Sequence, residues 1–162
     1  MELGEHLASA AAARPLHAVA IPLPAQGHLN PLMRLCRALA SRHGFLITFV
    51  NIQPIHDRIL DCMQNPTGPD AADGHPVRSP PLRIRRVSLP INGLDLENDF
   101  RLSFVDFLIA TRSLSKPLES FLQSIGEEGC GFPPVTCLIS DNFMSGAVQN
   151  VAEKLGIPWP FI

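Results

Sequence analysis

The strongest constraint on the fold is the alternation between short strand-like runs and longer amphipathic segments. Strand-like runs cover residues 17–22, 45–50, 82–89 and 135–141, and a fifth begins at residue 157. The segments between them carry apolar residues at helical spacing, as in Leu32, Leu35, Cys36 and Leu39. Strands that alternate with helices form a parallel sheet, because each helix carries the chain back across it. The sequence therefore predicts an α/β fold with a Rossmann-like parallel sheet and helices on both faces.

Residue preferences also predict where helices begin and where one of them breaks. Asn30 is a good N-cap and Pro31 suits the first helical position, so we expect the first helix to start there. A long helix rich in phenylalanine is predicted over residues 97–125. Pro117 should kink or split that helix near Ser115, because proline lacks the N–H that continues the hydrogen-bond pattern.

The composition is that of a globular chain and argues against two kinds of partner. The chain has 13 Lys and Arg against 15 Asp and Glu, a formal charge of −2, which does not suit nucleic acid. No apolar run reaches the ~20 residues that a membrane helix needs. Residues 1–14 lack the pattern of a secretory signal, so we expect a disordered leader and a cytoplasmic protein. A single domain is expected over residues 15–162.

The cysteines and glycines do not indicate a metal or a nucleotide cofactor. Cys36, Cys62, Cys130 and Cys137 form no C-x-x-C pair, and no histidine lies at zinc-site spacing from them. The chain also lacks a P-loop and a G-x-G-x-x-G turn. We therefore expect reduced thiols, no metal and no cofactor.

Two polar residues follow strands at the edge of the sheet where ligands bind in folds of this kind. His28 lies in the turn after the first predicted strand, and Asp141 ends the fourth. An aspartate beside a histidine fixes its tautomer and stabilises the imidazolium form. Such a pair could take a proton from a hydroxyl group, so that its oxygen attacks an electrophile. Position alone leaves two other interpretations open, a surface or capping role for His28 and an N-cap role for Asp141.

Four segments of the chain, at residues 24–31, 89–94, 138–143 and 152–158, together resemble the family 1 UDP-glycosyltransferases, especially those of plants. The most specific is Pro-Ala-Gln-Gly-His-Leu-Asn-Pro at 24–31, which resembles the first-loop signature of that family. Leu-Ile-Ser-Asp-Asn-Phe at 138–143 is similar to the family's strand that ends in Asp before an aromatic residue. The segments at 152–158 and 89–94 are also similar, although Ile-Asn at 91–92 departs from the commoner Asp-Gly.

The resemblance implies a GT-B arrangement, in which two Rossmann-like domains face each other across a cleft. It implies that the N-terminal domain holds the acceptor and the C-terminal domain holds the UDP-sugar, which is a co-substrate. His28 would be the general base that activates an acceptor hydroxyl, and Asp141 would balance its charge. The hydroxyl oxygen would displace UDP with inversion at the sugar carbon, without a metal.

The acceptor would be a small lipophilic molecule, phenolic or terpenoid, and the sugar would by family default be glucose. The contacts to the acceptor are expected in the first turn, in the loop after the third strand and in aromatic residues of two helices. The predicted acceptor-binding residues are Gln26, Gly27, Asn92, Gly93, Phe100, Phe104 and Phe143.

The donor-binding signature of the family has no counterpart in this sequence. Trp159 is the only tryptophan, and no Gln or Glu cluster follows it. We therefore expect a domain that is truncated at its fifth strand, an absent donor-binding domain and no transferase activity of the chain alone. Two alternatives remain: a non-catalytic acceptor-binding or regulatory module, and another Rossmann-like enzyme such as a small hydrolase or reductase. The lack of a Gly-x-Ser-x-Gly elbow argues against the second.

Overall fold

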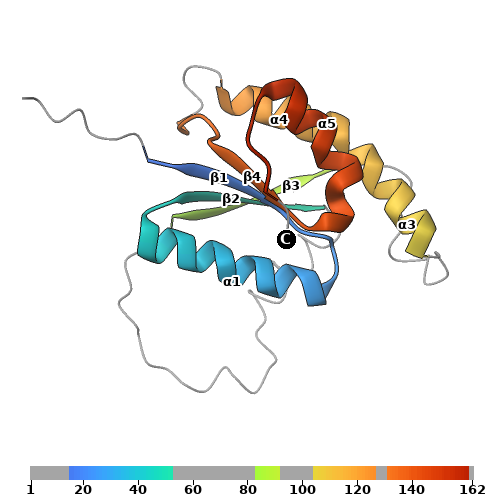
Figure 1. Cartoon of the computed structure of the whole chain (residues 1–162), viewed down its shortest axis with the longest axis horizontal. Coiled ribbons are helices and arrows are strands. Elements are labelled where there is room, and N and C mark those ends of the chain that lie inside the picture. The colour runs from blue at the N-terminus through green and yellow to red at the C-terminus, as the bar shows by residue number, and fades with distance from the viewer. Residues whose placement is uncertain (1–14, 53–82, 92–103, 127–130, 161–162) are drawn as a thin grey trace, which may run out of the picture.

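The computed structural model of the chain describes residues 15–52, 83–91, 104–126 and 131–160, and four parallel strands form one sheet in them. The strands lie in the order β3-β2-β1-β4 (Figure 1). Their bounds are His17–Ile21 for β1, Leu46–Ile52 for β2, Ile84–Leu89 for β3 and Cys137–Ser140 for β4. The predicted parallel α/β fold is thus confirmed.

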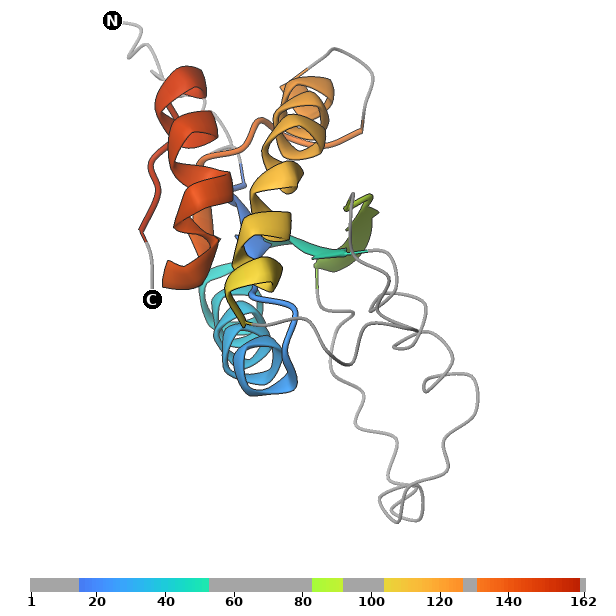
Figure 2. The same cartoon turned by 90° about the vertical axis from the view of Figure 1, so that its right-hand side faces the viewer.

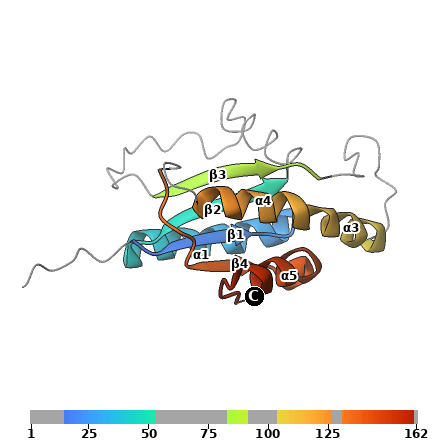
Figure 3. The same ribbon diagram turned by 90° about the horizontal axis from the view of Figure 1, so that it is seen from above.

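Helices cover both faces of this sheet (Figures 1 and 3). Helix α1 lies along one face, whereas α4 and α5 lie on the other, with α3 leading into α4. Figure 2 shows the same layers after a quarter turn. The helices have the bounds Gln26–His43 for α1, Phe104–Thr111 for α3, Ser115–Gly126 for α4 and Ser145–Leu155 for α5. Two 3₁₀ turns, η2 at Arg112–Leu114 and η3 at Asn142–Met144, precede α4 and α5.

The two layers of helices bury two separate apolar cores. Alternate residues of β1 point to opposite faces, so Ala18 and Ala20 pack beneath α1 while Val19 and Ile21 pack beneath α4 and α5. All five residues of β1 are buried, as expected for a central strand of a parallel sheet. This rigid centre holds the carboxyl ends of β1 and β4 next to each other.

Helix α1 begins at Gln26, five residues before the predicted first helical residue, Pro31. Ala25, in extended conformation, precedes its first residue, and the carbonyl of Ala25 accepts from the N–H groups of His28 and Leu29. Asn30 is therefore not the N-cap, and Pro31 lies inside the helix. Leu29 packs against the core below α1, and this packing outweighs the local preference of Asn30 for a cap.

The predicted break in the long aromatic helix is confirmed. The chain passes from α3 through η2 into α4, whose first residue is Ser115 and whose third is Pro117. Proline is tolerated in the first turn of a helix, so the break precedes it. Residues 97–103 of the predicted helix lie outside the described residues, as do Asn92, Gly93 and Phe100.

The fifth strand expected from residue 157 is not formed over residues 157–160. One ladder-like bond is present, from the N–H of Leu138 to the carbonyl of Pro158 at 2.9 Å. The side chain of Trp159 also donates from Nε1 to Oγ of Ser140 at 2.6 Å. Proline at positions 158 and 160 supplies no N–H, so this segment lies against β4 without a regular ladder. The predicted leader at 1–14 lies outside the described residues.

Candidate active site

The site lies at the carboxyl ends of β1 and β4, which are neighbours in the sheet. Ala20 pairs with Ile139 and Ile21 with Ser140, so the chain leaves both strands at the same level. From β1 it turns directly into α1, where His28 is the third residue. From β4 it continues into Asp141, which precedes η3. Parallel pairing thus brings together two residues that are far apart in the sequence.

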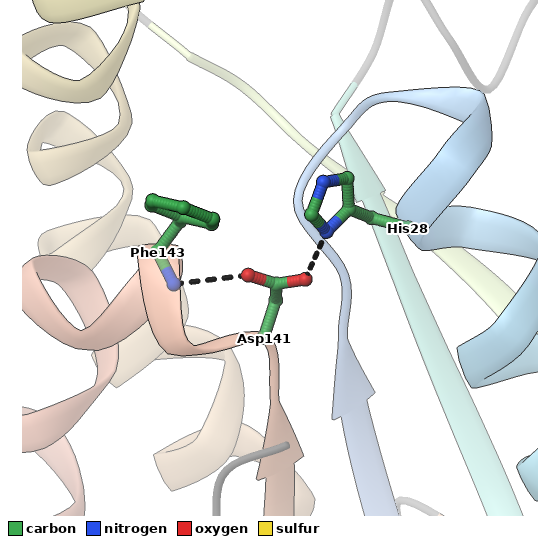
Figure 4. Close-up of polar contacts among 3 residues, drawn as sticks. All are labelled: His28, Asp141 and Phe143. Carbon is green, nitrogen blue, oxygen red and sulfur yellow. Dashed lines mark hydrogen bonds and ion pairs between the residues drawn. The ribbon is translucent and has the colours of Figure 1, made fainter.

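A hydrogen bond joins the side chains of His28 and Asp141 (Figure 4). The bond joins Nδ1 of His28 to Oδ2 of Asp141. The other carboxylate oxygen, Oδ1, accepts from the backbone N–H of Phe143 at 2.9 Å. Asp141 therefore caps η3 and holds His28 at the same time, so the capping interpretation and the pairing interpretation describe the same side chain.

This arrangement fixes the tautomer of a neutral His28. A carboxylate can only accept hydrogen bonds, so Nδ1 of His28 must carry the proton that is shared with Asp141. The lone pair of the imidazole then lies on Nε2, on the opposite side of the ring. The His28 side chain is 36% exposed and that of Asp141 only 13%, so the base is reachable while its partner is shielded. Chemically, the pair can accept one proton from a bound hydroxyl group.

A pocket of about 390 Å³ opens beside this pair. Its lining consists of Gly27, His28, Pro31, Leu32, Asp141, Asn142 and Phe143. The ring of Phe143 meets that of His28 edge to face, with 5.9 Å between centroids and 82° between planes. Phe143 is 46% exposed, which is unusual for a large apolar side chain, and it forms part of the pocket wall. The apolar wall and the single acid–base pair suit a small molecule with a hydroxyl group.

The structure brings four of the predicted site residues together and leaves the rest apart or undescribed. Gly27 and Phe143 line the pocket with the pair formed by His28 and Asp141. Gln26 begins α1 and Phe104 begins α3, but the structure does not describe their side chains. The remaining predicted residues, Asn92, Gly93 and Phe100, lie outside the described part of the chain.

Three lining residues, Pro31, Leu32 and Asn142, were not predicted from the sequence. Pro31 and Leu32 follow His28 by three and four positions, which places them on the same side of a helix. That spacing would have identified them if the start of α1 had been placed at Gln26. Asn142 also lines the pocket, next to Asp141. Pro31 has a further effect, because it cannot donate the helical hydrogen bond to the carbonyl of Gly27.

Two observations concern metal ligands and membrane-spanning helices among the described residues. Within residues 15–52, 83–91, 104–126 and 131–160, no group of three or more His, Cys, Asp or Glu is placed to hold a metal ion. In the same ranges, no helix combines the length and the apolar character that crossing a membrane requires. The cytoplasmic location stays a prediction.

A sequence model of the family described as "Glycosyltransferase, N-terminal domain" matches residues 15–154. The chain belongs to this glycosyltransferase family. The match includes β1, α1, β4 and almost all of α5, and with them both members of the His28–Asp141 pair.

Curated relatives of this glycosyltransferase domain are plant enzymes that are considerably longer. UDP-glycosyltransferase 85A1 of Arabidopsis thaliana is 36% identical over 144 residues, 88% of this chain and 27% of that protein. The 7-deoxyloganetin glucosyltransferase of Gardenia jasminoides is 37% identical over 145 residues, again 88% of this chain and 27% of that protein. The chain thus spans about 27% of the length of these relatives.

Solved structures of plant glycosyltransferases share the fold of this domain. UGT89C1 of Arabidopsis thaliana, solved with quercetin, has a TM-score of 0.63 at 20% identity, over 90% of this chain and 34% of that one. A UGT transferase of Siraitia grosvenorii, solved with UDP, has a TM-score of 0.63 at 20% identity, over 91% of this chain and 27% of that one. The likeness shows that the chain has part of the N-terminal domain of a GT-B fold.

Proposed function

We propose that this chain is the acceptor-binding part of a UDP-glycosyltransferase, with His28 as the general base. The enzyme would transfer a sugar, glucose by family default, from a UDP-sugar to a hydroxyl group of a small acceptor. The hydrogen bond between His28 and Asp141 at the edge of an open, largely apolar pocket is the observation that carries this proposal.

The chemistry follows from the free lone pair of His28. An alcohol or phenol in the pocket donates its proton to Nε2, and its oxygen attacks the anomeric carbon of the sugar from the face opposite the UDP. A new carbon–oxygen bond forms, the bond to the diphosphate breaks, and the configuration inverts. The proton remains on His28 as imidazolium, and the carboxylate of Asp141 offsets its charge. The N-terminus of α1 lies two residues before His28 and favours the negative charge that develops on the oxygen.

The relatives support the substrate classes but do not identify the molecules. The Gardenia relative is named as a 7-deoxyloganetin glucosyltransferase, and UGT89C1 was solved with quercetin. A phenolic or terpenoid acceptor is consistent with both. We infer that the UDP-sugar contacts lie in the part of the relatives that this chain does not span, so the purified chain alone is expected to transfer no sugar.

A chimeric enzyme provides the test. The chain replaces the matching segment of UDP-glycosyltransferase 85A1, which leaves the remainder of that enzyme intact. We expect the chimera to transfer glucose from UDP-glucose to simple phenols, whereas the 162-residue chain alone does not. His28→Ala should abolish transfer in the chimera and retain UDP binding, which serves as the control for folding.

The outcomes separate the two leading hypotheses. A chimera that binds UDP and phenols, but transfers no sugar, would contradict the proposal and support a non-catalytic acceptor-binding module. If His28→Ala transfers sugar as fast as the unsubstituted chimera, then His28 is not the general base, although the chain would still be part of a glycosyltransferase.

A further inference from the structure

A second pocket adjoins the one that contains His28. It has a volume of about 300 Å³ and lies between η2 and the first turn of α5. The two pockets share Asn142 and Phe143, which stand between them. A molecule bound beside His28 would reach the second pocket by passing Phe143.

The second pocket differs from the first in its charge. Arg112, Asn142 and Ser145 contribute polar side chains to its lining. Among the described residues, the carboxylate of Asp141 contacts His28 and that of Glu119 contacts Lys154, and neither contact involves Arg112. The positive charge of Arg112 is thus not neutralised by a carboxylate in the described part of the chain.

The position of Arg112 depends on a glycine in α5. A Cβ atom added at Gly146 would lie 3.2 Å from both Cγ and Nε of Arg112. Contacts of 3.2 Å are tighter than most Cβ atoms make, so the side chain of Arg112 lies against α5 at Gly146, and an alanine there would require it to move by a few tenths of an ångström. Gly146 is the second residue of α5, and alanine has the higher helix propensity of the two. The presence of glycine therefore has a structural consequence, the placement of an arginine beside the pocket.

We propose that Arg112 binds an anionic group of the acceptor, so that the site favours acceptors with a carboxylate remote from the reacting hydroxyl. This inference rests on the proposed function, because it takes the pocket of His28 as the place of the hydroxyl. A guanidinium group matches a carboxylate with two parallel hydrogen bonds. Asn142 and Ser145 can donate further hydrogen bonds to the same group.

The first experiment measures binding to the 162-residue chain by calorimetry. The probes are 4-hydroxycinnamate and its methyl ester, which differ in charge but share the phenol and the aromatic frame. We expect the acid to bind about tenfold more tightly than the ester, the strength of one charge-assisted contact at an open site. Arg112→Gln should remove this difference and leave ester binding unchanged, and Arg112→Lys should keep part of it.

A matched control and a second variant keep the result interpretable. Arg42→Gln removes the same charge from the exposed last turn of α1 and should leave the preference intact. Gly146→Ala should shift the side chain of Arg112 by a few tenths of an ångström and reduce the preference without removing it. The inference is overturned if acid and ester bind equally, if neither binds, or if Arg112→Gln retains the full preference.

Further measurements on the chimera distinguish an acceptor carboxylate from the donor diphosphate as the anion that Arg112 binds. They also show whether the anion site or the proposed function has failed. If Arg112→Gln weakens binding of UDP-glucose to the chimera and leaves the acid preference unchanged, the anion is the donor diphosphate and the inference is wrong. If the chimera glucosylates neutral phenols with no dependence on Arg112, the inference fails and the proposed function stands. If Arg112 governs binding of the acid but the chimera transfers nothing, the proposed function fails and the anion site stands.

Discussion

Nδ1 of His28 and Oδ2 of Asp141 are hydrogen-bonded although 113 residues separate them in the sequence. The sheet creates this contact, because β1 and β4 are adjacent and parallel and end at the same level. His28 lies in the first turn of α1, the helix that follows β1, and Asp141 follows β4 directly. The proposed chemistry thus depends on the register of two strands as well as on the two side chains.

The proton on His28 is the basis of the first prediction. In Asp141→Asn, the amide oxygen should keep the bond to the N–H of Phe143, which leaves the NH₂ group facing Nδ1 of His28. Nδ1 must then accept a hydrogen bond from that NH₂ group, so the neutral ring carries its proton on Nε2. Nε2 then has no free lone pair and cannot act as the base. We expect kcat of the chimera to fall by roughly 10²–10⁴ while the acceptor KM changes little.

The control for this prediction is Glu153→Gln, which removes one carboxylate from an exposed position on α5. It should leave kcat unchanged. A loss of acceptor binding in Asp141→Asn, in place of a loss of kcat, would show that Asp141 acts on the shape of the pocket and not on the proton.

Phe143 supports a prediction about acceptor binding. Its backbone holds Asp141, whereas its half-exposed ring contacts His28 and forms part of the pocket wall. Phe143→Ala keeps the backbone bond and removes the ring. We expect the acceptor KM to rise about tenfold, in line with the ~1 kcal/mol of an aromatic contact, with kcat reduced less. Steady-state kinetics of the chimera with a neutral phenol measure both, and an unchanged KM would contradict the prediction.

Most of the fold followed from local patterns, and the exceptions have physical causes. The strands were predictable because β1, β2 and β4 are short apolar runs buried within the sheet. The start of α1 was not, because the packing of Leu29 outweighs the capping preference of Asn30. At residues 157–160 the apolar pattern suggested a strand, but the two prolines there leave too few N–H groups for a ladder.

The site was predictable in its pair of residues and not in its surroundings. Both His28 and Asp141 follow strands, and this placement is visible in the sequence. The second pocket could not be predicted from the sequence. Arg112 and Gly146 both line it, and the contact between them joins two separate segments of the chain, which no local pattern reports.

His17 supports a prediction about stability and pH. Its ring is fully buried, with Nδ1 hydrogen-bonded to the carbonyl of Pro133 and Nε2 to Oγ1 of Thr48, both at 2.8 Å. Burial lowers the pKa of His17, and the nearby charge of Arg85 lowers it further, against the opposing effect of the Pro133 carbonyl. The folded protein therefore stays neutral at His17 when the unfolded chain, with an ordinary pKa near 6.5, takes up a proton.

This difference in pKa between the folded and unfolded states sets the direction in which the free energy of unfolding changes with pH. Above pH ~6.5 both states are neutral at His17 and the contribution is constant. As pH falls below that value, the unfolded chain binds more protons, so the free energy of unfolding decreases, by at most about 1.4 kcal/mol per pH unit. Thermal unfolding between pH 7.5 and 5 should show this loss. His17→Gln should show a shallower slope, whereas His43→Gln, at an exposed position in α1, should keep the original slope.

Asn51 supports the last prediction, in which a polar side chain is replaced by an apolar one. It is 3% exposed at the end of β2, and neither its amide nitrogen nor its amide oxygen has a hydrogen-bond partner among the described residues. Its strand position places it on the same face as Ile47 and Phe49, beneath α1. An unpaired buried amide costs about 1–3 kcal/mol, and leucine has nearly the same shape. Asn51→Leu should therefore raise the free energy of unfolding by a similar amount.

The matched control is Asn150→Leu, the same substitution at an exposed position of α5, which should change stability by less than about 0.5 kcal/mol. Denaturant titration of the three proteins gives the comparison directly. A lower stability of Asn51→Leu would mean that the amide is paired in solution, with a bound water as the simplest partner, because a paired amide loses its hydrogen bonds when leucine replaces it.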